Sequence, residues 1–333
     1  MRSFFIVSLV CVFAFQSQLL AQVEKPRTIP KFLVGPPSPN WDGSALRNMA
    51  EHPEQWEECR KHVDAILYAD HVLHRQFQND DSGLTELLRK FDKMNLPFQL
   101  EVGAVKPWGH TGAIAFEKQY RQWERFLKCG MKIEGIAMDE PLNCSVDHLK
   151  KDMEYAATET VEFISLVHKN YPDWNVGDIE GFPSLKADDV IKWIDLLQVK
   201  LKEKGERGLD FFRLDIDWMH FVHNTGRGTW ADVRRIETAC RQRGIPFSLV
   251  YWAADYPSLL KKNMADDKTW YIGVMQMGYD YVAVGGKPDQ YVVQSWVAGP
   301  STILPESEPF SFIRSALDIA DRIMNNKSET IIE

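Results

Sequence analysis

Eight short apolar segments alternate with amphipathic stretches along the chain after Pro30. We predict that the apolar segments are strands: Phe32–Gly35, Val63–Tyr68, Phe98–Gly103, Ile133–Asp139, Val176–Glu180, Phe211–Asp217, Phe247–Trp252 and Tyr291–Trp296. The other stretches have helical periodicity: Glu51–Lys61, Leu84–Met94, Phe116–Lys128, Val146–Asn170, Ala187–Lys204, Trp230–Arg243, Tyr256–Met277 and Phe310–Met324. Strands that alternate with helices pair in parallel, and eight such units without a break in composition predict one α/β domain, a closed (β/α)8 TIM barrel.

The segment after the first predicted strand argues against a dinucleotide-binding fold. Such a fold has a Gly-x-Gly-x-x-Gly turn there, whose backbone N–H groups bind the pyrophosphate. This chain has Val34-Gly35-Pro36-Pro37-Ser38-Pro39 instead, and proline has no N–H to donate. Because the sequence also has no phosphate loop and no Gly-x-Ser-x-Gly motif, it predicts no cofactor and no serine hydrolase chemistry.

Composition and charge restrict the class of partner. Of the 333 residues 44% are hydrophobic, enough to bury a core, and the net charge of -8 gives no electrostatic reason to bind nucleic acid or anionic lipid. Arg2 precedes an apolar run, Phe4–Phe15, that is too short to span a bilayer. We predict a signal peptide at 1–21 and a barrel domain at 22–333, in a secreted or periplasmic protein without membrane attachment.

Four cysteines follow the predicted signal peptide: Cys59, Cys129, Cys144 and Cys240. Three of them lie on different predicted helices, whereas a disulfide needs Cα atoms within about 7 Å of each other. We therefore expect mostly free, buried thiols. The sequence has no Cys-x-x-Cys pair, so a structural zinc site is not expected.

Alternation along the predicted strands places charged side chains on one face. In Phe211–Asp217 the apolar residues alternate with Arg213, Asp215 and Asp217, and successive side chains of a strand point to opposite faces. The apolar face must contact the helices, so we predict that the charged face lines the barrel interior. The same argument predicts that six more side chains point inward: Glu101, Asp139, Asp178, Glu180, Gln294 and Trp296.

Carboxylates near the carboxyl ends of the strands are the main candidates for function, because active sites of TIM barrels lie at that face. On this basis we predict that four residues are catalytic: Asp139, Glu140, Glu180 and Asp217. Two interpretations, substrate binding or a structural ion-pair network with Arg213, remain open for the deeper carboxylates Asp178 and Asp215.

The end of the fourth predicted strand reads Ile136-Ala137-Met138-Asp139-Glu140-Pro141-Leu142-Asn143. This segment resembles the Asn-Glu-Pro end of strand four in the large clan of retaining glycosidases built on (β/α)8 barrels. The resemblance implies a glycoside hydrolase in which Glu140 is the acid/base, with Asp139 in the place of the Asn that binds the sugar 2-hydroxyl. That clan has a nucleophilic Glu at the end of strand seven, where this chain reads Leu249–Asp255 without a Glu.

Glycosidic cleavage requires two carboxyl groups, about 5 Å apart for retention or roughly 6.5–9.5 Å apart for inversion. We predict that Glu140 is the general acid and that Glu180 or Asp217 is the nucleophile or base, with retention and inversion both open. Asp255 is a third candidate partner, but it could equally be the N-cap of the following helix. Asp139 beside Glu140 would raise the pKa of one of the two by like-charge repulsion.

Aromatic and polar side chains expected at the same face predict a carbohydrate substrate. Sugar rings stack their C–H faces on indole rings, while amides and carboxylates bind the hydroxyl groups. The predicted binding residues are His71, Glu101, Asp178, Asp215, Trp218, Trp252, Asp255, Gln294 and Trp296. Trp296 is expected to form the floor of the subsite at the scissile bond. The sequence has no His-Glu-x-x-His or His-x-His signature, so no catalytic metal is predicted.

Two other functions remain open. A metal-dependent sugar isomerase or epimerase on the same fold would use Glu101, Asp139, Glu180 and Asp217 as ligands. A carbohydrate-binding protein that kept the barrel cleft without catalysis would explain the missing strand-seven Glu. Loss of activity with EDTA would favour the first, and glycan binding without turnover would favour the second.

Overall fold

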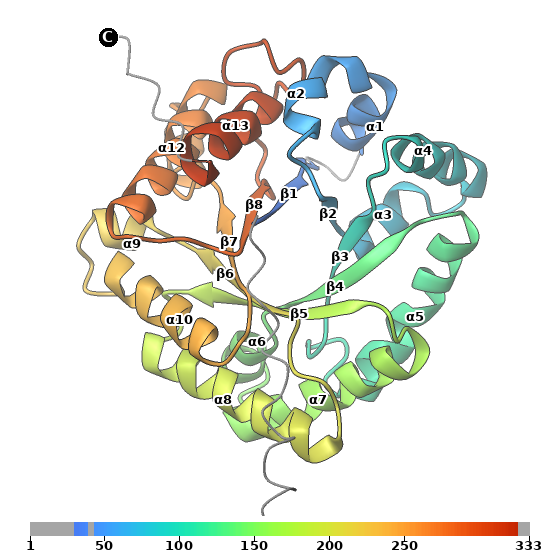
Figure 1. Ribbon diagram of the computed structural model, residues 1–333, viewed down its shortest axis with the longest axis vertical. Helices are drawn as coiled ribbons and strands as arrows, with labels where there is room; N and C mark the ends of the chain where they lie inside the picture. Colours follow the sequence, from blue (N-terminus) through green and yellow to red (C-terminus); the bar gives the residue numbers. More distant parts are fainter. Residues whose placement is uncertain (1–29, 39–42, 326–333) are drawn as a thin grey trace, which may run out of the picture.

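The computed structural model describes residues 30–38 and 43–325. Eight parallel strands close into a barrel in which β8 pairs with β1 (Figure 1). The strands are β1 (Lys31–Gly35), β2 (Ala65–Ala69), β3 (Phe98–Val102), β4 (Ile133–Asp139), β5 (Asn175–Phe182), β6 (Phe211–Ile216), β7 (Phe247–Tyr251) and β8 (Gln290–Gln294). This confirms the predicted (β/α)8 TIM barrel. The predicted signal peptide lies outside the described residues.

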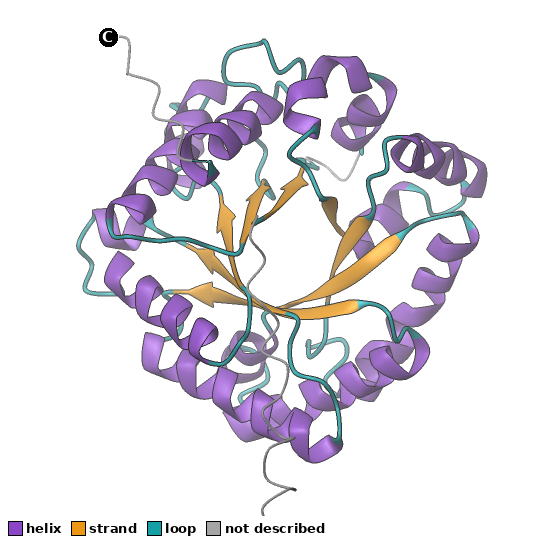
Figure 2. Cartoon of the chain, in the orientation of Figure 1, coloured by secondary structure: helices purple, strands orange, loops and turns teal. Residues whose placement is uncertain are grey.

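Helices surround the strands as an outer ring (Figure 2). They are α1 (Ser44–Glu51), α2 (Glu57–Arg60), α3 (Asp70–Gln76), α4 (Asp81–Lys93), α5 (Gly112–Lys128), α6 (Pro141–Asp147), α7 (Met153–Asn170), α8 (Ala187–Lys204), α9 (Met219–Val222), α10 (Trp230–Gln242), α11 (Tyr256–Lys261), α12 (Asp267–Ala283) and α13 (Phe312–Asp318). A 3-10 turn, η2 (Pro53–Trp56), and a π-helical turn, η3 (Ile319–Met324), complete the ring. None of the helices described is long and apolar enough to cross a membrane.

Two of the predicted helices, Val146–Asn170 and Tyr256–Met277, are each divided into two α-helices in the structure. The periodicity of Val146–Asn170 continues through a break between α6 and α7, where Lys150 has a left-handed φ of 55°. Asp152 then starts α7, because its side chain accepts a hydrogen bond of 2.8 Å from the Tyr155 N–H. An N-cap of this kind satisfies a donor that has no partner within the helix, so it defines the start of α7.

A small apolar cluster lies in the barrel interior, separate from the main core between strands and helices. It consists of Ala137 of β4, Ile179 of β5 and Phe211 of β6. Arg213 lies with its guanidinium 4.7 Å from the centre of the Phe211 ring, and its Nη2 donates a hydrogen bond of 2.7 Å to Gln99 Oε1. This hydrogen bond joins β6 to β3 across the interior, and Arg213 points inward as predicted.

Gly177 of β5 is required by this interior packing. A Cβ at position 177 would lie 2.2 Å from the Phe211 ring, a distance that side chains cannot adopt. We expect Gly177→Ala to lower the free energy of unfolding by about 1–3 kcal/mol, the usual cost of overpacking. Urea unfolding measures this loss. The double variant with Phe211→Leu should recover part of it, and simple additivity of the two changes would contradict the proposed contact.

All four described cysteines are buried, free thiols, as predicted: Cys59, Cys129, Cys144 and Cys240. Burial raises the pKa of the Cys59 and Cys240 thiols. Neutral buried thiols are poor nucleophiles, so these two residues act as small apolar groups of the core.

Candidate active site

The carboxylates of β5 point away from the barrel interior, so the predicted inward orientation of Asp178 and Glu180 is wrong. The interior residue of this strand is Ile179. Asp178 instead accepts a hydrogen bond of 2.6 Å from Trp193 Nε1, which belongs to α8 outside the barrel. Burial raises the pKa of Asp178 well above its usual range. Asp178 is therefore a structural residue between strand and helix.

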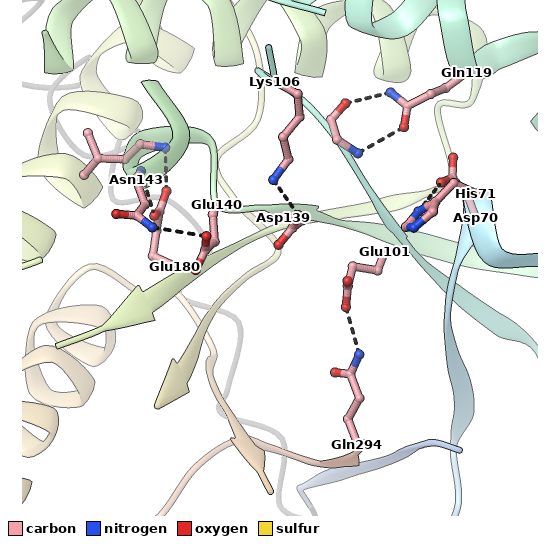
Figure 3. Close-up of polar contacts among 12 residues, drawn as sticks. Asp70, His71, Glu101, Lys106, Gln119, Asp139, Glu140, Asn143, Glu180 and Gln294 are labelled. Atoms are coloured by element: carbon pink, nitrogen blue, oxygen red, sulfur yellow. Dashed lines mark hydrogen bonds and ion pairs between the residues drawn. The ribbon is translucent and has the colours of Figure 1, made fainter. Parts of the chain in front are cut away.

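Glu180 binds the first backbone amides of α6. Its Oε1 accepts a hydrogen bond of 2.6 Å from the Leu142 N–H, and its Oε2 accepts one of 3.1 Å from the Asn143 N–H (Figure 3). Helix-start N–H groups have no partner within the helix, and a buried end needs an acceptor from elsewhere. The alternation of side chains along β5 was predicted correctly, but the side on which the carboxyl groups lie was not. On the helix side an indole N–H donates to Asp178 and two backbone amides donate to Glu180.

Glu101 and Gln294 face each other inside the mouth of the barrel, as predicted. Gln294 Nε2 of β8 donates a hydrogen bond of 2.9 Å to Glu101 Oε2 of β3 (Figure 3). Burial, with repulsion from Asp139, raises the pKa of Glu101 to about 7. A carboxyl group with this pKa can both accept and release a proton near neutral pH.

Asp139, at the end of β4, pairs with Lys106, which the sequence analysis did not single out. The Lys106 Nζ lies 2.5 Å from Asp139 Oδ2 (Figure 3). Burial by itself would lower the pKa of Lys106, but the Asp139 carboxylate outweighs it, so the pKa of Lys106 is raised. Lys106 therefore keeps its positive charge in a mostly buried position. Its place in the loop after β3 was the available signal, since such loops form the active sites of barrels.

His71 lies beside these groups at the start of α3. Its Nδ1 is 3.7 Å from Oδ1 of the buried Asp70, and the other Asp70 oxygen accepts a hydrogen bond of 2.8 Å from Trp123 Nε1. The contact with Asp70 raises the pKa of His71 despite partial burial. His71 thus lies at the mouth of the barrel, as predicted, and the neighbouring Asp70 orients its ring.

Glu140 follows β4 in a strained backbone conformation. Its φ of 46° is left-handed, which is uncommon for a residue with a side chain. The Glu140 Oε2 accepts a hydrogen bond of 3.1 Å from Asn143 Nδ2. The Glu140 Oε1 lies against Gly181, where an added Cβ would be only 2.3 Å away. Burial, followed by the charge of Asp139, raises the pKa of Glu140, in the direction predicted for this pair.

Three other predicted carboxylates lie in different surroundings. Asp215 belongs to the interior face of β6, where burial raises its pKa well above the usual range. Asp217 is half exposed and lies 3.6 Å from His220 Nε2. Asp255 stands before α11 and points toward α12, where a Cβ on Gly273 would lie 2.7 Å from its Oδ1. Asp217 and Asp255 therefore do not lie in the same site as Glu101 and Asp139.

Of the predicted binding tryptophans, Trp218 and Trp252 are buried and bind backbone. Trp218 Nε1 donates to the Trp252 carbonyl and Trp252 Nε1 donates to the Ile216 carbonyl, both at 2.9 Å. Trp296 is 45% exposed and lies against Trp252, with 4.3 Å between ring centres. Trp296 is therefore available to a ligand, whereas Trp218 and Trp252 hold the rim together.

Two adjoining cavities open at this end of the barrel and share His71 and Glu101. The first has a volume of about 340 Å³ and is lined by Lys106, Trp108 and Asp139 among others. The second has a volume of about 350 Å³ and extends past Gln294 to Trp296. Each is within the range of small-molecule sites, about 300–1,000 Å³. Neither Glu140 nor Asp215 lines them.

The predicted metal-ligand set does not converge. Glu101 and Asp139 face the first cavity, but Glu180 binds α6 and Asp217 lies beside His220. Within residues 30–38 and 43–325, no three His, Cys, Asp or Glu side chains form a group that could hold a metal ion. The four residues predicted as metal ligands for the isomerase alternative therefore do not form one site.

No family model and no curated protein matches the chain. Among solved structures, it is similar to the probable 3-DHS dehydratase AsbF from Bacillus anthracis, with a TM-score of 0.50, 10% identity, and coverage of 87% of this chain and 98% of that one. It is also similar to D-psicose 3-epimerase, with a TM-score of 0.48, 14% identity and coverage of 88% and 99%. The aldolase QR15 has a TM-score of 0.44, 12% identity and coverage of 86% and 93%. At these identities the likeness shows the barrel fold alone.

The prediction of a glycoside hydrolase is wrong. None of the three similar structures named above is a glycoside hydrolase, and their likeness shows the fold alone. The geometry of the site carries the correction. The first predicted partner of Glu140 was Glu180, whose carboxyl group is occupied by the amides of α6, and the second was Asp217, which lies beside His220. The resemblance of the segment ending β4 is thus confined to a short motif on a common fold.

Proposed function

We propose that this protein is a sugar isomerase that moves a proton from the carbon next to the carbonyl group to the carbonyl carbon. One observation carries the proposal: Glu101 and the charged Lys106 line the same cavity at the mouth of the barrel. A proton-accepting carboxylate and a fixed cation are the two groups that removal of such a proton requires.

The roles follow from the chemistry of the two side chains. The Glu101 carboxylate takes the proton from carbon, and the electron pair moves onto the carbonyl oxygen. The ammonium group of Lys106 stabilises the negative charge that develops there. Protonated Glu101 returns the proton to the neighbouring carbon, while a hydroxyl proton passes between the two oxygens. The product is an isomer of the substrate, with no proton gained or lost.

The state of Lys106 favours this role over nucleophilic attack. A lysine that forms a Schiff base must lose its proton, and enzymes lower its pKa for that purpose. Here Asp139 raises the pKa of Lys106, so the charged form is stabilised. Lys106 is accordingly assigned as an electrostatic group, with Asp139 as the residue that positions it.

Solvent exchange tests the proposal directly. The protein is incubated in deuterated water with a panel of aldoses and ketoses, and proton NMR follows loss of the signal from the carbon next to the carbonyl. We expect exchange and formation of an isomer for at least one sugar. A protein that binds sugars but neither exchanges a proton nor forms an isomer would be a binding protein, and the proposal would fail.

Lys106→Met should lower the exchange rate about 10²–10³-fold, the usual effect of removing one group that stabilises an oxyanion. Methionine keeps most of the side-chain volume and removes the charge. Lys132→Met is the matched control, because Lys132 pairs with Asp92 away from the cavities. An unchanged rate in Lys106→Met would remove Lys106 from the mechanism.

A further inference from the structure

The second cavity differs from the first in its charge. The first is lined by Lys106, Lys118, Asp70 and Asp139 in addition to the shared His71 and Glu101. Among the described residues that line the second cavity there is no Lys or Arg. Besides His71 and Glu101, which line both cavities, its polar groups are uncharged side chains such as Gln294 and Ser295. A phosphate group there would have no Lys or Arg to bind, and the shared His71 already contacts Asp70, whereas an uncharged hydroxylated group would find donors and acceptors.

The second cavity also has a rigid aromatic wall. Trp296 is 45% exposed, and behind it lies Trp252, which is buried and held by the hydrogen bond of its Nε1 to the Ile216 carbonyl. An exposed indole that a buried ring supports loses little freedom when a ligand stacks on it. Its flat apolar surface matches the C–H face of a sugar ring.

The two cavities have nearly equal volumes and meet at His71 and Glu101. Trp108, at the first cavity, is also 45% exposed, and a Cβ on Gly103 would lie 2.6 Å from its ring. The pair of cavities thus has one exposed tryptophan in each part and the proposed acid/base between them. This arrangement has room for a ligand of two ring-sized units rather than one.

We propose that the substrate is an uncharged oligosaccharide of at least two units, whose carbonyl-bearing unit occupies the Lys106 cavity while the neighbouring unit stacks on Trp296. This inference rests on the proposed function, because it assigns the reacting unit to the cavity of Glu101. The glycosidic bond between the units stays intact. The reaction remains the proton transfer described above, and the number of sugar units does not change.

Isothermal titration calorimetry tests the inference independently of turnover. The probes are cellobiose, maltose and lactose, the monosaccharides glucose and galactose, and glucose 6-phosphate. We expect at least one disaccharide to bind about fivefold more tightly than its component monosaccharides, since stacking on one aromatic ring is worth about 1 kcal/mol. Trp296→Ala should remove this advantage and leave monosaccharide binding nearly unchanged, while Trp296→Phe should keep most of it.

Tyr279→Ala is the matched control, because Tyr279 is an aromatic residue of α12 with a similar exposure of 44%. It should bind every probe as the wild type does. Equal affinity for disaccharides and monosaccharides, an advantage that survives in Trp296→Ala, no binding of any disaccharide, or tighter binding of glucose 6-phosphate would each overturn the inference.

The two proposals fail in different ways. Exchange of a monosaccharide proton together with equal affinity for both classes of sugar would leave the proposed function standing and overturn the inference. Disaccharide binding that depends on Trp296, without exchange of any proton, would support the two-unit site and overturn the proposed function.

Discussion

Glu101→Gln is expected to lower proton exchange by about 10²–10⁴-fold, the usual contribution of a positioned acid/base. Glutamine keeps the shape of the side chain and a hydrogen-bond partner for Gln294, but it cannot carry the proton. In the wild type the rate should rise with pH through about 7, as burial and Asp139 raise the pKa of Glu101 to that value. Exchange measured by NMR across pH 5–9, roughly two units on either side of that pKa, tests both statements.

The same variant should be more stable than the wild type at high pH. A carboxyl group whose pKa rises from 4.5 to about 7 on folding favours the folded state less as pH rises through that interval. The increase in the free energy of unfolding caused by Glu101→Gln should therefore be absent near pH 4. It should grow to as much as about 3 kcal/mol above pH 7. Urea unfolding at several pH values measures it. Parallel pH profiles of the two proteins would show that Glu101 does not have the raised pKa.

Glu180→Leu is expected to lower the free energy of unfolding by about 2–6 kcal/mol, because each buried N–H left without an acceptor costs about 1–3 kcal/mol. The two donors are the Leu142 and Asn143 amides at the start of α6. Glu180→Gln keeps one acceptor and should lose less. Urea unfolding of the three proteins gives the series.

Turnover distinguishes this structural role from the catalytic one first predicted for Glu180. The folded fraction of Glu180→Gln should exchange protons at close to the wild-type rate, since Glu180 does not line the first cavity. Asp178→Asn is the control within the same strand, because asparagine keeps an acceptor for Trp193 Nε1. A large loss of turnover in Glu180→Gln without loss of stability would return Glu180 to the active site.

The strands were predictable because each is a local pattern. The predicted Ile133–Asp139 is β4 to the residue, and the other strands differ by a few residues at their ends. Helix ends were less predictable, since they depend on caps such as Asp152 and on single left-handed residues such as Lys150. A periodic pattern alone does not show where a short turn interrupts it.

The site was predictable only in part, because a carboxyl group on a strand can be satisfied from either side. Alternation placed Asp215 of β6 correctly and Glu180 of β5 incorrectly, although the two patterns look alike in the sequence. The difference comes from α6, whose first backbone amides donate hydrogen bonds to the Glu180 carboxylate on the helix side. Lys106 was missed because its place in the loop after β3 was its one signal, and the sequence does not show that Asp139 lies beside it.

The sequence by itself determined the closed barrel and the end of it at which functional groups gather, because hydrophobic periodicity and parallel pairing are properties of short segments. Only the tertiary structure decided which carboxyl groups face the cavities and which support helices. That choice depends on donors contributed by residues far away in the chain, such as Trp193 for Asp178 and Gln294 for Glu101. A polar group is placed by its partners, and those partners come together only when the barrel closes.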